Sequence, residues 1–121
     1  VIKKGRHGET YNIGGNNEWA NLDVVNLLCE LIDTRFAADK KLAARFPDSP
    51  CAKGEPAKSL ITFVIDRPGH DTRYAINAAK ISSELGYDPV EDFDSGLDKT
   101  VDWYLTNEAW CRSIQDGSYK H

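Results

Sequence analysis

The apolar run "LITFVI", Leu60–Ile65, is the feature that most constrains the fold of this chain. Its β-branched and aromatic residues predict a buried strand. One other segment, Glu9–Gly14, has the alternation of a strand, with Tyr11 and Ile13 between polar neighbours. Two strands so far apart in the sequence do not form a stable sheet by themselves, because each leaves backbone groups unpaired. We therefore expect the chain to be a fragment of a longer protein that supplies the missing neighbours.

Most of the other apolar residues have helical spacing. Those from Val24 to Ile32 recur as on one face of an amphipathic helix, which we expect to begin at Asn21 as its N-cap and to continue to Phe46. The next segment, "PDSPCAKGEP" at residues 47–56, contains three prolines and a glycine and predicts a loop.

Two further helices are predicted nearer the C-terminus. The first is short, with Asn77 as its N-cap and Gly86 at its end. The second has Asp94 or Ser95 as its N-cap and continues, after a bend, past Trp110.

The fold class that follows is α/β, mostly helical with two or three short strands. The 121 residues, 1–121, fit a single domain. The net charge of −4 argues against a nucleic-acid partner, since such domains are usually basic. No apolar run approaches the roughly 18 residues of a membrane-spanning helix. We therefore expect a cytoplasmic protein with no nucleic acid and no membrane among its partners.

The cysteines show no chemical pattern. Cys29, Cys51 and Cys111 are widely spaced and form no metal-binding motif with the scattered histidines. We expect neither a disulfide framework nor a metal site. Cys29 lies within the helical apolar pattern, which favours a buried free thiol.

The turn "DRPGHD", which follows the predicted strand, is the candidate binding site. Arg67 comes directly after that strand, so its backbone is anchored and its guanidinium suits bidentate contact with a phosphate. Pro68 fixes its own φ, and Gly69 permits a tight turn or the close approach of a ligand. His70 can donate to an oxygen atom, and Asp66 can orient either cation. Together they predict an anion-binding turn, at the end of a strand where α/β proteins tend to bind ligands.

Residue chemistry alone leaves a second interpretation open. Asp66 and Asp71 can equally neutralise Arg67 and Arg73 in a surface ion-pair turn that binds nothing. Asn17, just after the first predicted strand, is either a second polar wall of the site or a turn former.

Motifs of known catalytic chemistry are missing from the sequence. It contains no G-x-G-x-x-G, no P-loop, no G-x-S-x-G and no Tyr-x-x-x-Lys pair. No acid, base and nucleophile set is visible, so no residue is predicted to be catalytic.

Three segments of the chain resemble one family. "GETYNIGGNNEWANLDVV", "DRPGHDTRYAINAAKISSELGYDP" and "SGLDKTVDWYLTNEAW" are similar to the C-terminal portion of the dTDP-glucose 4,6-dehydratase family. Its members are extended short-chain dehydrogenases/reductases that act on nucleotide sugars. The resemblance runs from about Gly5 to Tyr119, and R-P-G-H-D followed by R-Y-A-I is its most specific part.

The resemblance implies a lyase that uses tightly held NAD to convert dTDP-glucose to dTDP-4-keto-6-deoxyglucose and water. It also implies that NAD sits on a preceding Rossmann domain. We therefore expect residues 1–121 to bind no NAD, to be inactive alone and to bind a dTDP-sugar weakly. The residues that the resemblance assigns to substrate binding are Asn17, Asp66, Arg67 at the diphosphate, Pro68, Gly69, His70 and, near the C-terminus, Tyr119.

The sequence departs from the family pattern in two places. Residues 38–59 look longer and more divergent than usual, and Thr72 stands where an arginine is common.

Three functions remain open. The first is the substrate-binding portion of the dehydratase, and the second is a non-catalytic interaction module, in either case a homo-oligomer formed for example by domain swapping. The third is a sister nucleotide-sugar epimerase or decarboxylase.

Overall fold

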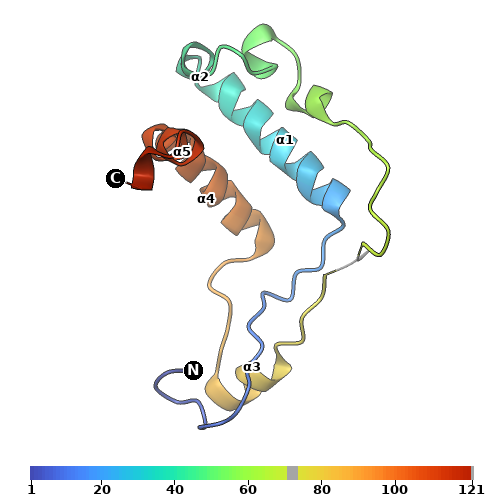
Figure 1. Ribbon diagram of the computed structural model, residues 1–121, viewed down its shortest axis with the longest axis vertical. Helices are drawn as coiled ribbons and strands as arrows, with labels where there is room; N and C mark the ends of the chain where they lie inside the picture. The colour runs from blue at the N-terminus through green and yellow to red at the C-terminus, as the bar shows by residue number, and fades with distance from the viewer. Residues whose placement is uncertain (71–73, 121) are drawn as a thin grey trace.

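The computed structural model describes residues 1–70 and 74–120 (Figure 1). Its longest helix, α1 (Asn21–Ala38), begins after Ala20, so the predicted N-cap, Asn21, is instead the first helical residue. A prediction of one continuous helix to Phe46 is wrong, because Asp39 is extended, with φ −123° and ψ 99°. The Asp39 carboxylate accepts a hydrogen bond from the N–H of Lys41 (2.9 Å), and a separate helix follows, α2 (Lys41–Arg45).

The proline-rich segment after α2 is irregular apart from a short 3-10 helix, η1 (Cys51–Lys53). A second 3-10 helix, η2 (Ala57–Leu60), follows Pro56 and contains the first residue of the run predicted to be a strand. Both turns lie beside α1 (Figure 1). The Asp33 carboxylate of α1 holds them there, because it accepts hydrogen bonds from the Cys51 thiol (3.2 Å) and the Ala57 N–H (2.8 Å).

The C-terminal region contains three helices where the sequence predicted two, the second with a bend, and their starts differ from the prediction. The short helix α3 (Ala79–Leu85) ends at Gly86, as predicted, with the glycine in the left-handed region at φ 68°. Its predicted N-cap, Asn77, lies one residue before the observed cap and accepts from the N–H of Ala79 (2.9 Å).

Helix α4 (Phe93–Thr106) is capped by Asp92, whose carboxylate accepts from the N–H of Ser95 (2.7 Å). The predicted caps, Asp94 and Ser95, are therefore wrong, because a carboxylate nearer the start satisfies the free N–H groups first. The predicted bend is confirmed at Asn107, after which come α5 (Glu108–Gln115) and a 3-10 turn, η3 (Ser118–Lys120).

Within residues 1–70 and 74–120, neither predicted strand forms. Residues 9–14 and 61–65 are not helical, but no ladder of backbone hydrogen bonds joins either one to another described segment. The sequence prediction of two or three short strands is therefore wrong for the described residues. A β-branched sequence favours extended backbone, whereas a strand also requires a neighbour within hydrogen-bonding distance.

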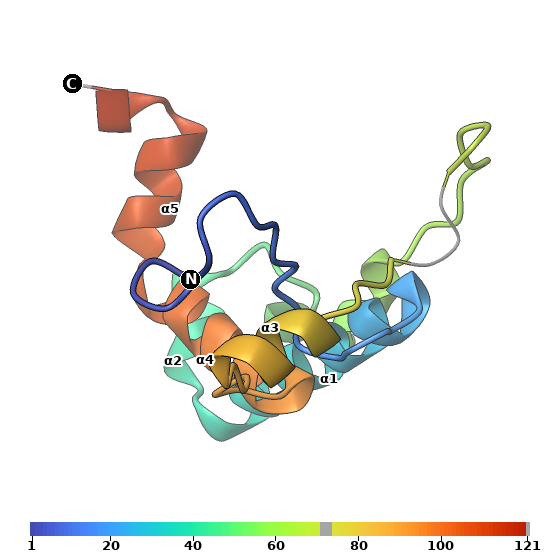
Figure 2. The same ribbon diagram turned by 90° about the horizontal axis from the view of Figure 1, so that it is seen from below.

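The molecule has two parts (Figure 1). The helical half consists of α1, α2, the two 3-10 turns beside them, α4 and α5, with α1 alongside α4. The arm half consists of residues 1–18 and α3, at the opposite end of the picture. Residues 61–70 extend away from both, as Figure 2 shows from below.

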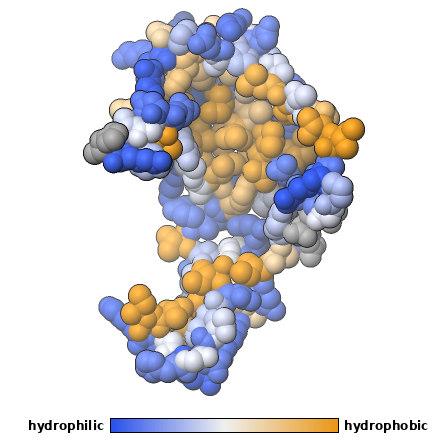
Figure 3. All heavy atoms as spheres, in the orientation of Figure 1, coloured by the Kyte–Doolittle hydropathy of each residue, from blue (hydrophilic) through white to orange (hydrophobic). Residues whose placement is uncertain are grey.

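Burial is sparse in both halves. The buried apolar residues are Leu42, Ala57 and Val101 in the helical half and Ala78 and Ile81 beside or within α3. The accessible surface is 9676 Å², against about 6,500 Å² expected for a compact protein of this mass. Figure 3 shows apolar side chains gathered over the helical half. In the part of the chain that the structure describes, no helix is both long and apolar enough to span a membrane.

Candidate functional site

The turn at Asp66–His70 is organised around one carboxylate. Asp66 accepts a hydrogen bond from the N–H of Arg67 (2.8 Å), and its two oxygens lie 2.8 and 2.9 Å from Nδ1 of His70. The backbone N–H of His70 donates to the backbone carbonyl of Arg67 (3.3 Å), which closes the turn. Gly69 has φ 74°, a left-handed conformation that suits glycine, and Pro68 precedes it. The sequence "DRPGH" therefore folds locally into a turn stabilised by its own side chains.

The electrostatics of the turn follow from these bonds. The hydrogen bond from His70, and then that from the Arg67 N–H, lower the pKa of Asp66 below its ordinary value. The carboxylate is therefore ionised near neutral pH and can only accept, so Nδ1 of His70 carries the hydrogen atom. The other ring nitrogen, Nε2, has no partner among the described residues and can contact a ligand.

The guanidinium of Arg67 makes no ion pair or hydrogen bond with any of residues 1–70 or 74–120. The ion-pair interpretation of the turn required Asp66 to neutralise Arg67, but Asp66 instead binds the Arg67 backbone and His70. The other proposed pair, Asp71 and Arg73, lies outside the described residues. An exposed arginine of this kind is available to bind an anion.

Asn17 lies in a second feature, a cleft of about 310 Å³. The cleft joins the end of the N-terminal segment to the residues just downstream of the turn, because Gly14 packs directly against Ile76. A Cβ atom at Gly14 would lie only 2.1 Å from Cγ2 of Ile76, so this close approach requires glycine. The residues that line the cleft are Gly15, Asn16, Asn17, Glu18, Tyr74, Ala75 and Ile76.

Tyr119 is not brought to this cleft. It lies in η3, half exposed, with the ammonium of Lys120 5.7 Å from its ring centroid. Figures 1 and 2 both place the C-terminal end of the chain far from residues 61–70. Its role in substrate binding stays a prediction.

Sequence reasoning missed Tyr74, Ala75 and Ile76 as cleft residues. The available signal was Gly14, since a glycine in an extended segment often marks the close approach of another backbone. Only tertiary structure shows that the approaching segment is the one that leaves the turn.

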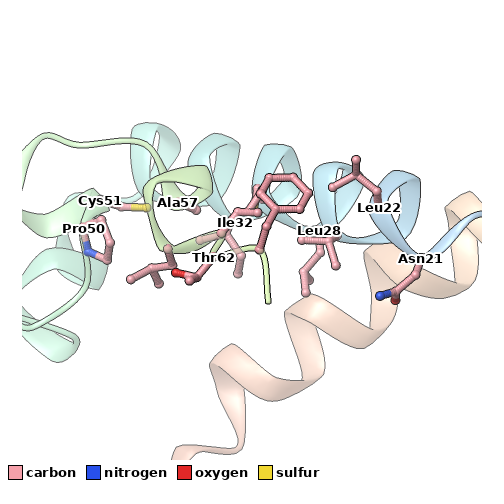
Figure 4. Close-up of a pocket in the computed structure, with 13 residues that line it drawn as sticks. Asn21, Leu22, Leu28, Ile32, Pro50, Cys51, Ala57 and Thr62 are labelled. Carbon is pink, nitrogen blue, oxygen red and sulfur yellow. The ribbon is translucent and has the colours of Figure 1, made fainter. Parts of the chain in front are cut away.

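A larger groove, which the sequence did not predict, runs along α1 (Figure 4). Its volume is about 590 Å³ and its walls are mostly apolar. Cys29 and Cys51 both line it as free thiols and are half-buried, so Cys29 is less buried than the sequence predicted. Burial raises the pKa of both thiols, which favours the unreactive protonated form. The lining residues come from α1 (Asn21, Leu22, Val25, Leu28, Cys29, Ile32) and from residues 50–63 (Pro50, Cys51, Ala57, Leu60, Ile61, Thr62, Phe63).

Comparison with known proteins assigns the chain to a family. The family model described as GDP-mannose 4,6 dehydratase matches residues 3–100. The chain belongs to this family. It is 47% identical to the dTDP-glucose 4,6-dehydratase of Xanthomonas campestris pv. campestris over 120 residues, 99% of this chain and 30% of that protein. The corresponding identity is 48% over 120 residues to the enzyme of Neisseria meningitidis serogroup B, again 99% of this chain and 31% of that protein.

The chain spans about 30% of the length of these relatives and corresponds to their C-terminal portion. A solved structure agrees with this. The crystal structure of dTDP-glucose 4,6-dehydratase from Bacillus anthracis in complex with NAD superposes with a TM-score of 0.66 at 41% identity, covering 91% of this chain and 28% of that one. The predicted resemblance to the C-terminal portion of dTDP-glucose 4,6-dehydratase is confirmed.

Proposed function

We propose that this chain supplies the substrate-binding portion of an NAD-dependent dTDP-glucose 4,6-dehydratase, which converts dTDP-glucose to dTDP-4-keto-6-deoxyglucose and water. The observation that carries the proposal is the turn at Asp66–His70, in which Asp66 fixes the backbone and the histidine while the Arg67 guanidinium is left to bind an anion. The relatives that match 99% of this chain are named dTDP-glucose 4,6-dehydratase.

The turn binds the nucleotide diphosphate through charge. Arg67 offers a planar fork of N–H donors to the phosphate oxygens. Because Nδ1 of His70 carries the hydrogen atom, Nε2 of the neutral ring is an acceptor and suits a hydroxyl group of the ligand. Asp66 acts on both as a positioning residue, because it orients the imidazole through Nδ1 and anchors the N–H of Arg67. Asn17 offers an amide from the cleft beside residues 74–76, whose lining includes neither Arg67 nor His70, so its share in substrate binding rests on the family resemblance.

NAD does not fit the residues of this chain. Within residues 1–70 and 74–120 no strand leads into a glycine-rich turn at a helix N-terminus, which is the arrangement that holds a dinucleotide pyrophosphate. We therefore assign no step of the hydride chemistry to these residues. The chain alone is expected to be inactive, and its cytoplasmic location stays a prediction.

Calorimetric or NMR titration with dTDP tests the binding role. We expect weak but saturable binding, and Arg67→Ala should weaken it by about ten- to a hundredfold, the effect of losing charge-assisted hydrogen bonds. Arg112→Ala is the matched control, since Arg112 is a mostly exposed arginine on α5 that pairs only with Glu108 among the described residues. Absence of binding up to millimolar dTDP, or equal loss in both variants, would contradict the proposal.

A turnover assay tests the predicted inactivity separately. Incubation of the chain with dTDP-glucose and NAD should give no 4-keto product. Formation of that product would show that the chain itself carries a catalytic set.

A second candidate function is the self-associating module without a sugar-nucleotide role. The observation that favours it is the large exposed apolar surface of the helical half and of residues 63–65. Self-association of the chain together with no detectable binding of dTDP would support this candidate over the first.

A further inference from the structure

The three residues before Asn17 have backbone positions that few side chains allow. Gly14 packs against Ile76, and a Cβ atom there would lie 2.1 Å from Cγ2 of that isoleucine. A Cβ atom at Gly15 would lie 3.3 Å from Nδ2 of Asn17, which is closer than an ordinary van der Waals contact. Asn16 has φ 54° and is the only non-glycine residue with a positive φ in the described part of the chain. Backbone conformations that side chains rarely adopt gather at functional sites.

The left-handed conformation of Asn16 places the Asn17 side chain over Gly15. In an extended segment the Cα atoms of residues i and i+2 are about 6.6 Å apart. The chain instead bends at Asn16, and Nδ2 of Asn17 lies beside the position that a Gly15 side chain would take. Asparagine and glycine tolerate this backbone conformation, whereas a β-branched residue does not.

The amide held in this way borders the cleft of about 310 Å³ and has no hydrogen-bond partner among the described residues. The segment that carries it starts from a fixed point, since Gly14 packs against Ile76, which also lines the cleft. An amide offers donors at its nitrogen and an acceptor at its oxygen, which suit hydroxyl and carbonyl groups. Neither Arg67 nor His70 lines this cleft, so Asn17 suits a part of the ligand other than the diphosphate.

We propose that Asn16 and Gly15 are positioning residues that hold the Asn17 amide toward a hydroxyl or carbonyl group of a nucleotide sugar, outside its diphosphate. This role rests on the proposed function, since it requires Asn17 and Arg67 to bind the same nucleotide sugar. Asn16 acts through its backbone conformation, so glycine can replace it and valine cannot. Gly15 acts through its missing Cβ atom, so alanine would push the Asn17 amide aside.

NMR of the free chain tests the geometry without any ligand. The side-chain NH₂ group of Asn17 should give a nuclear Overhauser cross-peak to the Hα atoms of Gly15, both in wild type and in Asn16→Gly. Asn16→Val should lose the cross-peak, because a β-branched residue avoids positive φ. Circular dichroism should show the same helix content in all three, since Asn16 is exposed and lies outside the helices. A cross-peak that is absent from wild type, or unchanged in Asn16→Val, overturns the proposal.

Calorimetric titration with two probes, dTDP-glucose and inorganic diphosphate, tests the effect on binding. Asn16→Val should weaken the binding of dTDP-glucose by about tenfold, the effect of losing one well-placed hydrogen bond. Asn16→Gly should restore most of that affinity, and Gly15→Ala should weaken binding less than Asn16→Val does. Gly96→Ala is the matched control and should change nothing, because a Cβ atom there would meet only Cβ of Glu91, at an ordinary 3.7 Å. None of these variants should change the affinity for inorganic diphosphate.

The two probes separate this role from the proposed function. Arg67→Ala should weaken the binding of both probes, and an unchanged affinity for diphosphate in that variant would contradict the proposed function. The positioning role is overturned if Asn16→Val binds dTDP-glucose as tightly as wild type, if it loses affinity for both probes equally, or if Asn16→Gly shares its loss. A wild type that binds neither probe contradicts both.

Discussion

Helices α1 and α4 are joined by a guanidinium shared between two carboxylates, whereas the N-terminal arm reaches α3 only through exposed pairs. Arg35 of α1 is partly buried and donates to Asp98 (2.6 Å) and Asp102 (2.8 Å) of α4. These bonds raise the pKa of Arg35 above its ordinary value. Apolar packing adds to them, since Val101 of α4 is buried.

The arm half has contacts of a different kind. Arg6 binds Glu84 (2.8 Å), which also accepts from the Tyr11 hydroxyl (3.0 Å), and Lys80 pairs with Glu9. Arg6 is mostly exposed and Glu84 is half-buried, and ion pairs with an exposed partner contribute little. The comparison shows that a helical segment, which closes its own backbone bonds, keeps its structure with modest packing, whereas an extended segment depends on neighbours.

The largest predicted effect comes from the cores of the two halves. Leu42→Ala removes a side chain that is 4% exposed in the helical half and should lower the free energy of unfolding by about 2–5 kcal/mol. Urea denaturation followed by circular dichroism measures it. Ile81→Ala, at a position 3% exposed in α3, should instead remove exchange protection from the arm half alone. Equal losses of global stability would show that the two halves unfold as one unit.

The shared guanidinium should have the next largest effect. Arg35→Ala leaves Asp98 and Asp102 without their cation and should lower the free energy of unfolding by about 1–3 kcal/mol. Arg112→Ala breaks an exposed pair within α5 and should lower it by about 0.5 kcal/mol or less. Thermal unfolding of both variants compares them. If the two losses are similar, the α1–α4 contact does not depend on this ion pair.

Substitutions at the helix caps should have smaller effects on stability and also distinguish the two halves. Asp92→Ala removes the acceptor at the start of α4 and should lower the unfolding midpoint of the helical half, by less than Arg35→Ala does. Asn77→Ala removes the acceptor before α3 and should only increase exchange at Ala79. Hydrogen exchange by NMR measures both. A fall in global midpoint from Asn77→Ala would mean that α3 is coupled to the other helices.

Acid should release the arm before it unfolds the helices. The hydrogen bond from Lys80 lowers the pKa of Glu9, and that from Arg6 lowers the pKa of Glu84, both below the ordinary value of 4.5. Such carboxylates stabilise the folded state above pH 4.5 and lose that contribution as the pH falls through their lower folded values. The protection of residues 6–11 against hydrogen exchange, relative to the intrinsic rate at each pH, should therefore fall below about pH 4.5. In Glu84→Gln that protection should already be reduced at neutral pH. Unchanged protection of the arm at pH 3 would contradict this.

Sequence patterns predicted the helices because their determinants are local. The apolar spacing within α1, Gly86 after α3 and the break near Trp110 each act within a few residues, and each corresponds to an observed element. Exact starts were harder to predict. At α4 several acidic side chains compete, and Asp92 is the one whose carboxylate reaches a free N–H group.

The turn at Asp66–His70 was predictable in composition and in part in geometry. A proline and glycine between charged residues indicated a tight turn, and Gly69 has the expected positive φ. Which acid binds which base was not predictable. The choice of Asp66 for His70 over the Arg67 side chain depends on where the turn directs each group.

By itself, the sequence determined the helices, the tight turn and the family resemblance, because these depend on short-range spacing and residue identity. Tertiary structure decided whether residues 61–65 become a strand, since a strand requires a neighbour that the sequence does not specify. It also decided that Gly14 meets Ile76 to form the cleft at Asn17, and that α1 leaves an apolar groove open. Both features join segments far apart in the chain, and such contacts depend on the fold of the whole molecule.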